Sequence, residues 1–221
     1  MQLIIFTGFF SGLIHVLGGA DHLVAMMPSS ITSPRSALRN GFSWSLGHSS
    51  GVIVLTIFTF FVKDISKLAR FSHFAEFLVG ISLLVIGFIA IRNSLRLKIH
   101  SHSHQHNDGI FHRHFHVHRD KGKKHNKHSH ALTSLGLLHG IAGGSHMLAI
   151  LPLIALPFAD SIAYLSSYLV GSIFAMNLFT YIISLTTLNV GPIFLKRFIA
   201  FAGGLSFSMG LFWIQKSSSY I

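Results

Sequence analysis

Three side chains that could bind a metal ion lie in an apolar stretch near the start of the chain. The stretch is GLIHVLGGADHLVAMMP, residues 12–28, and it contains His15, Asp21 and His22. An ionised side chain near the centre of a bilayer costs at least ~2.5 to 3.5 kcal/mol, so chains keep one there when it is paired or used. In a regular helix His15 and His22 lie two turns apart on one face. The pattern predicts a functional site.

The residues between these histidines allow the helix to open. Gly18 and Gly19 loosen a helix, which frees backbone carbonyls and lets Asp21 turn inward. Two imidazoles, a carboxylate and carbonyls form a nitrogen and oxygen ligand set that suits nickel(II), cobalt(II), copper(II) or zinc(II), whereas magnesium and calcium prefer oxygen alone. We predict His48, in FSWSLGHSSG, as a further ligand.

The same motif occurs a second time, 124 residues later. Residues 136–152, GLLHGIAGGSHMLAILP, match the first stretch at seven of seventeen positions. His139 and His146 repeat the two histidines, and we predict that they complete the site or form the next station on a path. Ser145 takes the place of Asp21. The half that carries the carboxylate should therefore bind a cation more tightly.

The composition of the chain indicates the elements that hold these residues. Half of the 221 residues are hydrophobic, 10% are charged, and the mean hydropathy is +0.58, which is typical of an integral membrane protein. Apolar runs near the ~20 residues that a spanning helix needs are residues 3–27, 41–62, 74–91, 132–157, 160–185 and 193–214. The predicted fold class is therefore an all-α integral membrane protein with six transmembrane helices.

The repeat divides these six spans into two halves, residues 1–91 and 132–221. Because each half has three spans, the second must cross the membrane in the opposite sense to the first, which gives two inverted three-helix repeats. Transporters use this architecture, with the substrate site near the midplane. Chance recurrence of small residues in membrane helices is the alternative.

The residues between the halves, 92–131, form a histidine-rich segment. Residues 100–130 hold eleven of the seventeen histidines, and such a polar tract predicts a disordered loop that collects metal ions or serves as a solvated spacer. Thirteen of the seventeen Lys and Arg lie on the side of this loop if the spans alternate. The positive-inside rule then predicts a cytoplasmic loop and both termini outside. The net charge of +11 reports this orientation instead of nucleic-acid binding.

Several motifs together resemble the nickel/cobalt transporter superfamily, most closely its short UreH-like branch, which is named for a urease accessory role. They are HVLGGADHL at 15–23, SLGHSSG at 45–51 and HGIAGGSH at 139–146, with six spans and a His-rich loop. The resemblance implies metal passage, with Ni²⁺ or Co²⁺ as the transported ion. It carries the ligand role to the matching positions, His15, Asp21, His22 and His48.

The expected function is membrane transport of a divalent transition-metal cation, which the resemblance implies is nickel or cobalt. We expect no enzymatic activity and no tightly bound cofactor. The expected partners are the lipid bilayer, the cation and a cytoplasmic metallochaperone, without nucleic acid, and the expected location is the bacterial plasma (inner) membrane. Open alternatives are a haem-ligating electron-transfer protein using His15, His22, His139 or His146, a zinc transporter of another family, and a metal-sensing or assembly protein.

Overall fold

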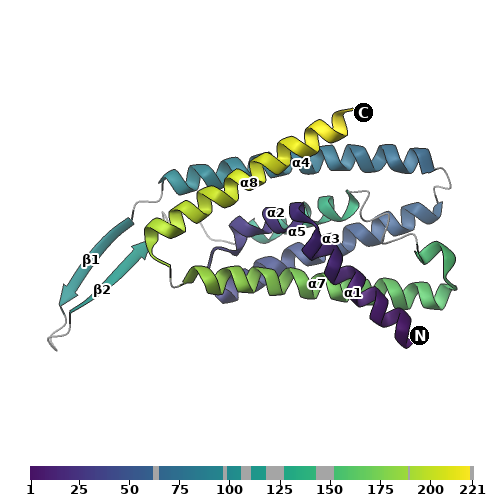
Figure 1. Cartoon of the computed structure of the whole chain (residues 1–221), viewed down its shortest axis with the longest axis horizontal. Coiled ribbons are helices and arrows are strands. Elements are labelled where there is room, and N and C mark those ends of the chain that lie inside the picture. Colours follow the sequence, from purple (N-terminus) through teal and green to yellow (C-terminus); the bar gives the residue numbers. More distant parts are fainter. Residues whose placement is uncertain are drawn as a thin grey trace.

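The computed structural model is built mainly from long helices that lie alongside one another (Figure 1). It describes residues 1–61, 65–96, 99–105, 111–117, 127–142, 152–188 and 190–219. The elements are α1 (Gln2–Gly18), α2 (Ala20–Ser30), α3 (Pro34–Phe61), α4 (Ile65–Arg96), β1 (Ile99–Gln105), β2 (Phe111–Val117), α5 (Lys127–Ile141), α7 (Phe158–Leu188) and α8 (Pro192–Ser218). Outside one hairpin, the described regular structure is helical.

Among the described residues, three helices are long and apolar enough to cross a membrane: Arg70–Arg96, Phe158–Thr187 and Ile193–Ser218. A bent pair, Gln2–Gly18 with Ala20–Ser30, makes a fourth if it is taken as one span. Membrane association therefore agrees with the sequence prediction, but the described residues do not show six spans in two repeats.

Two of the predicted spans, 41–62 and 132–157, are absent from this set for different reasons. The helix α3 has 28 residues, but Ser45, His48 and Ser49 lower its hydropathy, and all three side chains are buried against other helices. The run predicted at 132–157 is described only to residue 142 and again from 152. A test of length and hydropathy identifies spanning helices that face lipid more readily than it identifies spanning helices that are surrounded by protein.

Residues 92–131, which we predicted as a loop, include the end of one helix, the start of another and a β-hairpin. The helix α4 continues to Arg96, and α5 already begins at Lys127. Between them β1 and β2 pair antiparallel, and the register sets three histidine pairs opposite one another: His100 with His116, His102 with His114, and His104 with His112. In Figure 1 this hairpin leaves the helices at the end away from the N-terminus. The prediction of disorder in solution stays a prediction.

Helix α1 ends and α2 begins at Gly19, where the chain bends by 72°. The Gly19 backbone has φ −85° and ψ 93°, which is extended. Its N–H still donates to the His15 carbonyl at 3.0 Å, and its own carbonyl accepts from the His22 N–H at 3.1 Å. The predicted break at the glycine pair is therefore confirmed, at its second member.

Glycines bring α3 and α5 into backbone contact. A Cβ on Gly47 would strike the Thr133 carbonyl, and a Cβ on Gly136 would strike the Trp44 carbonyl. Gly140 packs on the His48 carbonyl in the same way. Small residues four apart are a usual means of close helix packing in membranes, where side-chain burial gives little drive for association.

The pairs α1–α7 and α4–α8 are packed by the same device. A Cβ on Gly12 would strike the Tyr168 carbonyl across the α1–α7 contact. Between α4 and α8, Gly80 lies against Gly210 and Gly87 against Gly203. The pair α4–α8 runs side by side in Figure 1. Three helix pairs thus have fixed spacing, which limits how the side chains between them can be arranged.

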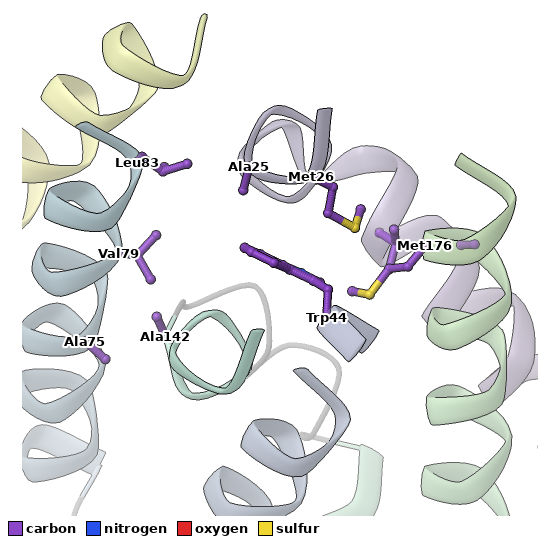
Figure 2. Close-up of a cluster of buried hydrophobic side chains, with 10 residues drawn as sticks. Ala25, Met26, Trp44, Ala75, Val79, Leu83, Ala142 and Met176 are labelled. Carbon is purple, nitrogen blue, oxygen red and sulfur yellow. The ribbon is translucent and has the colours of Figure 1, made fainter. Parts of the chain in front are cut away.

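Trp44 occupies the middle of the apolar core. Figure 2 shows its ring between Met26 of α2, Val79 of α4 and Met176 of α7. Trp44 is 1% exposed and Met26 is fully buried. Because four helices meet around this ring, the core sets the position of the histidines on the neighbouring turns.

Candidate metal centre

His15 and His22 meet across the bend between α1 and α2. In a straight helix seven residues span about 10.5 Å of rise, whereas here the two Nε2 atoms are 2.9 Å apart and the ring centroids 4.9 Å apart. The bend, rather than a shared helix face, brings the rings together. Two nitrogens bound side by side to one cation at ~2.0 to 2.1 Å are about 3.0 to 3.4 Å apart. The pair is thus close to the spacing that a shared cation requires.

Gly19 makes this approach possible because it lacks a side chain. A Cβ at position 19 would lie 2.9 Å from the His22 ring carbon Cδ2 and 3.1 Å from the His15 carbonyl oxygen. The neighbouring Gly18 has open space around it, with no atom within 4 Å of such a Cβ. The steric requirement for glycine therefore falls on Gly19.

His48 of α3 provides a third ring nitrogen. Ligand atoms of His15, His22 and His48 all lie within 4.8 Å of one another. His48 is fully buried, and its ring centroid lies 5.0 Å from that of His22 and 5.8 Å from that of His15. Three imidazoles from three helices thus face one small volume, which we call the histidine cluster.

His139 of α5 borders this cluster from the other half of the chain. Its ring centroid lies 5.9 Å from that of His22 and 4.9 Å from the Trp44 ring. The Nδ1–H donates to the Leu135 carbonyl at 3.1 Å, which leaves a lone pair on Nε2. That buried Nε2 has no hydrogen-bond partner within the described parts of the chain. Metal-ligating histidines are commonly oriented through their second ring nitrogen in this way.

Asp21 lies beside the histidine cluster instead of within it. Its Oδ2 is 3.7 Å from Nδ1 of His22, the ring nitrogen opposite the one that faces His15, and its side chain is 20% exposed. The sequence predicts Asp21 as a direct ligand, but its carboxylate faces the side of the His22 ring away from His15, at a distance longer than a hydrogen bond.

The structure thus brings together four of the six residues that we predicted as metal ligands, and Asp21 flanks them. The sixth, His146, lies in residues 143–151, outside the described residues. Sequence reasoning missed two aromatic side chains at this site, Trp44 against His139 and Tyr168 against His15, the latter with ring centroids 5.8 Å apart. Both could have been found, because Trp44 and Tyr168 are themselves 124 residues apart, the offset of the repeat.

Comparison with known proteins finds two similar plant proteins. The chain is 29% identical over 176 residues to the chloroplast protein FOR GROWTH AND FERTILITY 2 of Arabidopsis thaliana, covering 79% of this chain and 45% of that protein. It is 29% identical over 177 residues to FOR GROWTH AND FERTILITY 1 of the same plant, covering 79% and 47%. The chain therefore spans less than half the length of these relatives. No family model and no solved structure matches.

These comparisons overturn the resemblance to the nickel/cobalt transporter superfamily and its UreH-like branch. The relatives are plant chloroplast proteins, and neither name refers to nickel, cobalt, urease or transport. They give no support to a bacterial plasma membrane. Short motifs of histidine, aspartate and glycine therefore did not identify the family of the chain.

Proposed function

We propose that this protein transports a divalent transition-metal cation across a membrane through the histidine cluster. The observation that carries the proposal is the convergence of His15, His22 and His48 within 4.8 Å inside a bundle of apolar helices. Buried imidazoles in such a bundle are costly unless they are used. Packing alone does not require three of them to face one point.

The ligand chemistry narrows the class of cation. Neutral imidazole binds zinc(II), copper(II), nickel(II) and cobalt(II), whereas magnesium and calcium favour oxygen ligands. No sulfur ligand for copper(I) is available from cysteine, because the chain has none. A choice of nickel or cobalt rested on the family resemblance, so the proposal names the class of cation only.

Two inverted repeats would place this site on a path with access to either side, and glycine contacts support that arrangement. Gly12 packs on the Tyr168 carbonyl and Gly136 on the Trp44 carbonyl. A shift of 124 residues converts Gly12 to Gly136 and Trp44 to Tyr168, so the two contacts are counterparts across the halves. Such a match is what a two-fold relation between halves predicts.

Further contacts follow the same relation. Gly47 packs on the Thr133 carbonyl and Gly171 on the Phe9 carbonyl, again with both members 124 residues apart. Between α4 and α8, Gly80 contacts Gly210 and Gly87 contacts Gly203. A shift of 123 residues takes Gly80 to Gly203 and Gly87 to Gly210, so each contact is the counterpart of the other. Chance recurrence of small residues would not conserve which backbone each glycine touches.

The repeats are not chemically equivalent. His48 in the first half corresponds to Ser172 in the second, and Asp21 corresponds to Ser145. The first half therefore supplies three imidazoles and the carboxylate. We propose one preferred site, built mainly by the first half, with His139 as the contribution of the second.

The distribution of the ligands suits alternating access. His15 lies on α1, which is packed on α7, while His48 and His139 lie on α3 and α5, which are packed on each other. Movement of one tightly packed pair against the other would bring these nitrogens together or part them. Inverted-repeat transporters expose a central site to each side in turn by such rigid movements.

The histidine-rich hairpin and the basic residues around it supplement the proposal. On the charge distribution, we propose that the hairpin lies on the side of the membrane to which the positive-inside rule assigns basic loops, with a metallochaperone as donor or acceptor of the cation. The paired register of its histidines suits capture of cations next to the path. The relatives are chloroplast proteins by name, and a chloroplast membrane is the location that they suggest for this chain.

The test is radioactive metal uptake by proteoliposomes that contain the purified full chain. Nickel(II), cobalt(II) and zinc(II) are tried separately with the wild type, His15→Ala and His48→Ala, and with His130→Ala as a control that removes an exposed histidine of α5. We expect flux of at least one cation, at least about tenfold lower in the two cluster variants and unchanged in the control. Wild-type flux by His48→Ala would refute the site, and a haem absorbance band in the purified protein would favour the electron-transfer alternative.

A further inference from the structure

A second ionisable group is buried in the bundle, outside the histidine cluster. Glu76 of α4 is 2% exposed and lies within Arg70–Arg96, one of the candidate spans. Its Oε2 lies 3.2 Å from Nδ1 of His73 on the same helix and 3.5 Å from the Ser217 hydroxyl on the last turn of α8. A buried ionisable residue within a candidate span is by default a candidate for an ion or proton pathway.

The repeat shows that packing does not require this carboxylate. Ser94 at the end of α4 donates to the Lys196 carbonyl at the start of α8, at 2.8 Å. A shift of 123 residues converts Ser94 to Ser217 and Lys196 to His73, so Ser217 is the counterpart of a serine that ties α4 to α8. Ser94 binds a backbone carbonyl, whereas Ser217 donates to the carboxylate of Glu76, whose counterpart is Ile199.

The surroundings of Glu76 suit reversible uptake of a proton. The Glu76 side chain is 3% exposed and that of His73 is 24% exposed, so His73 links the buried carboxyl to the surface. The adjacent Ser72 hydroxyl is buried and has no hydrogen-bond partner among the residues that the structure describes. A carboxylate, an imidazole and hydroxyls are the groups from which proton relays in membrane proteins are built.

The helices packed against α4 contribute no other described titratable group next to Glu76 and His73 that could take up the proton. On α8, Lys216 lies over the Trp213 ring at 4.5 Å, and Lys196 and Arg197 lie near the start of the helix, at the opposite end from Ser217. On α2 and α5, the titratable side chains that the structure describes are those of Asp21, His22, His130 and His139. His130 is exposed, and the other three belong to the histidine cluster or flank it.

We propose that Glu76 and His73 form the proton site that couples metal movement to a proton gradient, an inference that rests on the proposed transport. Glu76 takes up one proton from one side of the membrane, becomes a neutral carboxylic acid, and releases the same proton to the other side. The two sites communicate through packing: Ala75 and Val79 of α4 share a core with Trp44, and Trp44 lies against His139.

Two flux measurements on the full chain in proteoliposomes separate coupling from metal binding. The first is uphill accumulation of radioactive nickel(II), cobalt(II) or zinc(II), whichever the wild type carries best, under a pH gradient imposed in each direction in turn. The second is exchange of external labelled for internal unlabelled metal without a gradient. For Glu76→Gln we expect at least a tenfold loss of accumulation and exchange within about twofold of wild type. Glu76→Asp should retain accumulation in part, and Ser94→Ala, at the counterpart joint that holds no carboxylate, should retain it in full.

The outcomes distinguish the two proposals. If the wild type carries none of the cations in either measurement, the proposed function fails and the coupling site fails with it. If the wild type carries metal and Glu76→Gln still accumulates it under the gradient, the coupling site alone is refuted. Equal loss of accumulation and exchange in Glu76→Gln would also refute coupling, because it would show a role in folding or in metal binding.

Discussion

At the scale of single residues, the two glycines at the bend have different roles although they are adjacent. Only Gly19 approaches the His22 ring and the His15 carbonyl closely enough to exclude a side chain. The contact between the two imidazoles therefore depends on one missing methyl group. Gly18, which has free space around it, offers a matched comparison.

We predict that Gly19→Ala weakens metal binding at least about tenfold, because the new Cβ must displace the His22 ring, 2.9 Å away. Gly18→Ala should bind within about twofold of wild type and be slightly more stable, since alanine is favoured over glycine in a helix. Titration calorimetry with each purified variant measures the affinities. Equal affinities in the two variants would show that the bend does not hold the pair together.

Asp21 provides a second residue-scale prediction. If it orients His22 without ligating the cation, Asp21→Asn should lower metal affinity about 10- to 100-fold without abolishing binding. Asp160→Asn, which removes a carboxylate from the first turn of α7, serves as the charge control and should bind as wild type does. Loss of binding as complete as that in a His22→Ala variant would instead make Asp21 a direct ligand.

At the scale of elements, the histidines are positioned by helix pairs that touch through glycine. His48 lies on α3 at one of these contacts: Gly140 of α5 packs on the His48 carbonyl, and Gly136 packs on the carbonyl of Trp44, one turn earlier. Spacing at a backbone contact cannot relax by rotating a side chain. The α3–α5 contact should therefore be sensitive to a single added methyl group.

We predict that Gly136→Ala destabilises the protein by about 1 to 3 kcal/mol, as overpacking does, and also weakens metal binding by displacing α3. Gly204→Ala in α8 is the control, because a Cβ there meets no atom within 4 Å, and it should be neutral or stabilising. Thermal unfolding in detergent, with and without metal, measures both effects. Unaltered stability of Gly136→Ala would mean that the two helices are not in close contact.

At the scale of the whole molecule, the histidine cluster lies between two helix pairs, and the proposed transport requires these pairs to move. Asn177 of α7 donates to the Ser45 hydroxyl of α3 at 3.4 Å, so this contact bridges the moving parts. The natural chain has no cysteine, which makes an introduced pair the sole thiols present.

We predict that Ser45→Cys with Asn177→Cys, bridged by a short bifunctional thiol reagent, blocks metal flux while leaving metal binding largely intact. Each single cysteine variant, treated with the same reagent, should transport normally. Flux in proteoliposomes and binding by calorimetry give the two measurements. Normal flux in the bridged protein would exclude movement between α3 and α7.

The sequence alone determined the membrane character, the break at the glycine pair, and which histidines to suspect, because these depend on composition, local backbone freedom and side-chain chemistry. The tertiary structure decided what the sequence could not. A 72° bend joined two rings that a straight helix keeps apart, glycine contacts brought His48 and His139 to the same place, and Asp21 was left beside them. The angle of the bend and the meeting of the helices depend on how separate segments pack. Trp44 and His48 each lie 92 positions from the glycine that packs on their carbonyl, and no local pattern contains such a contact.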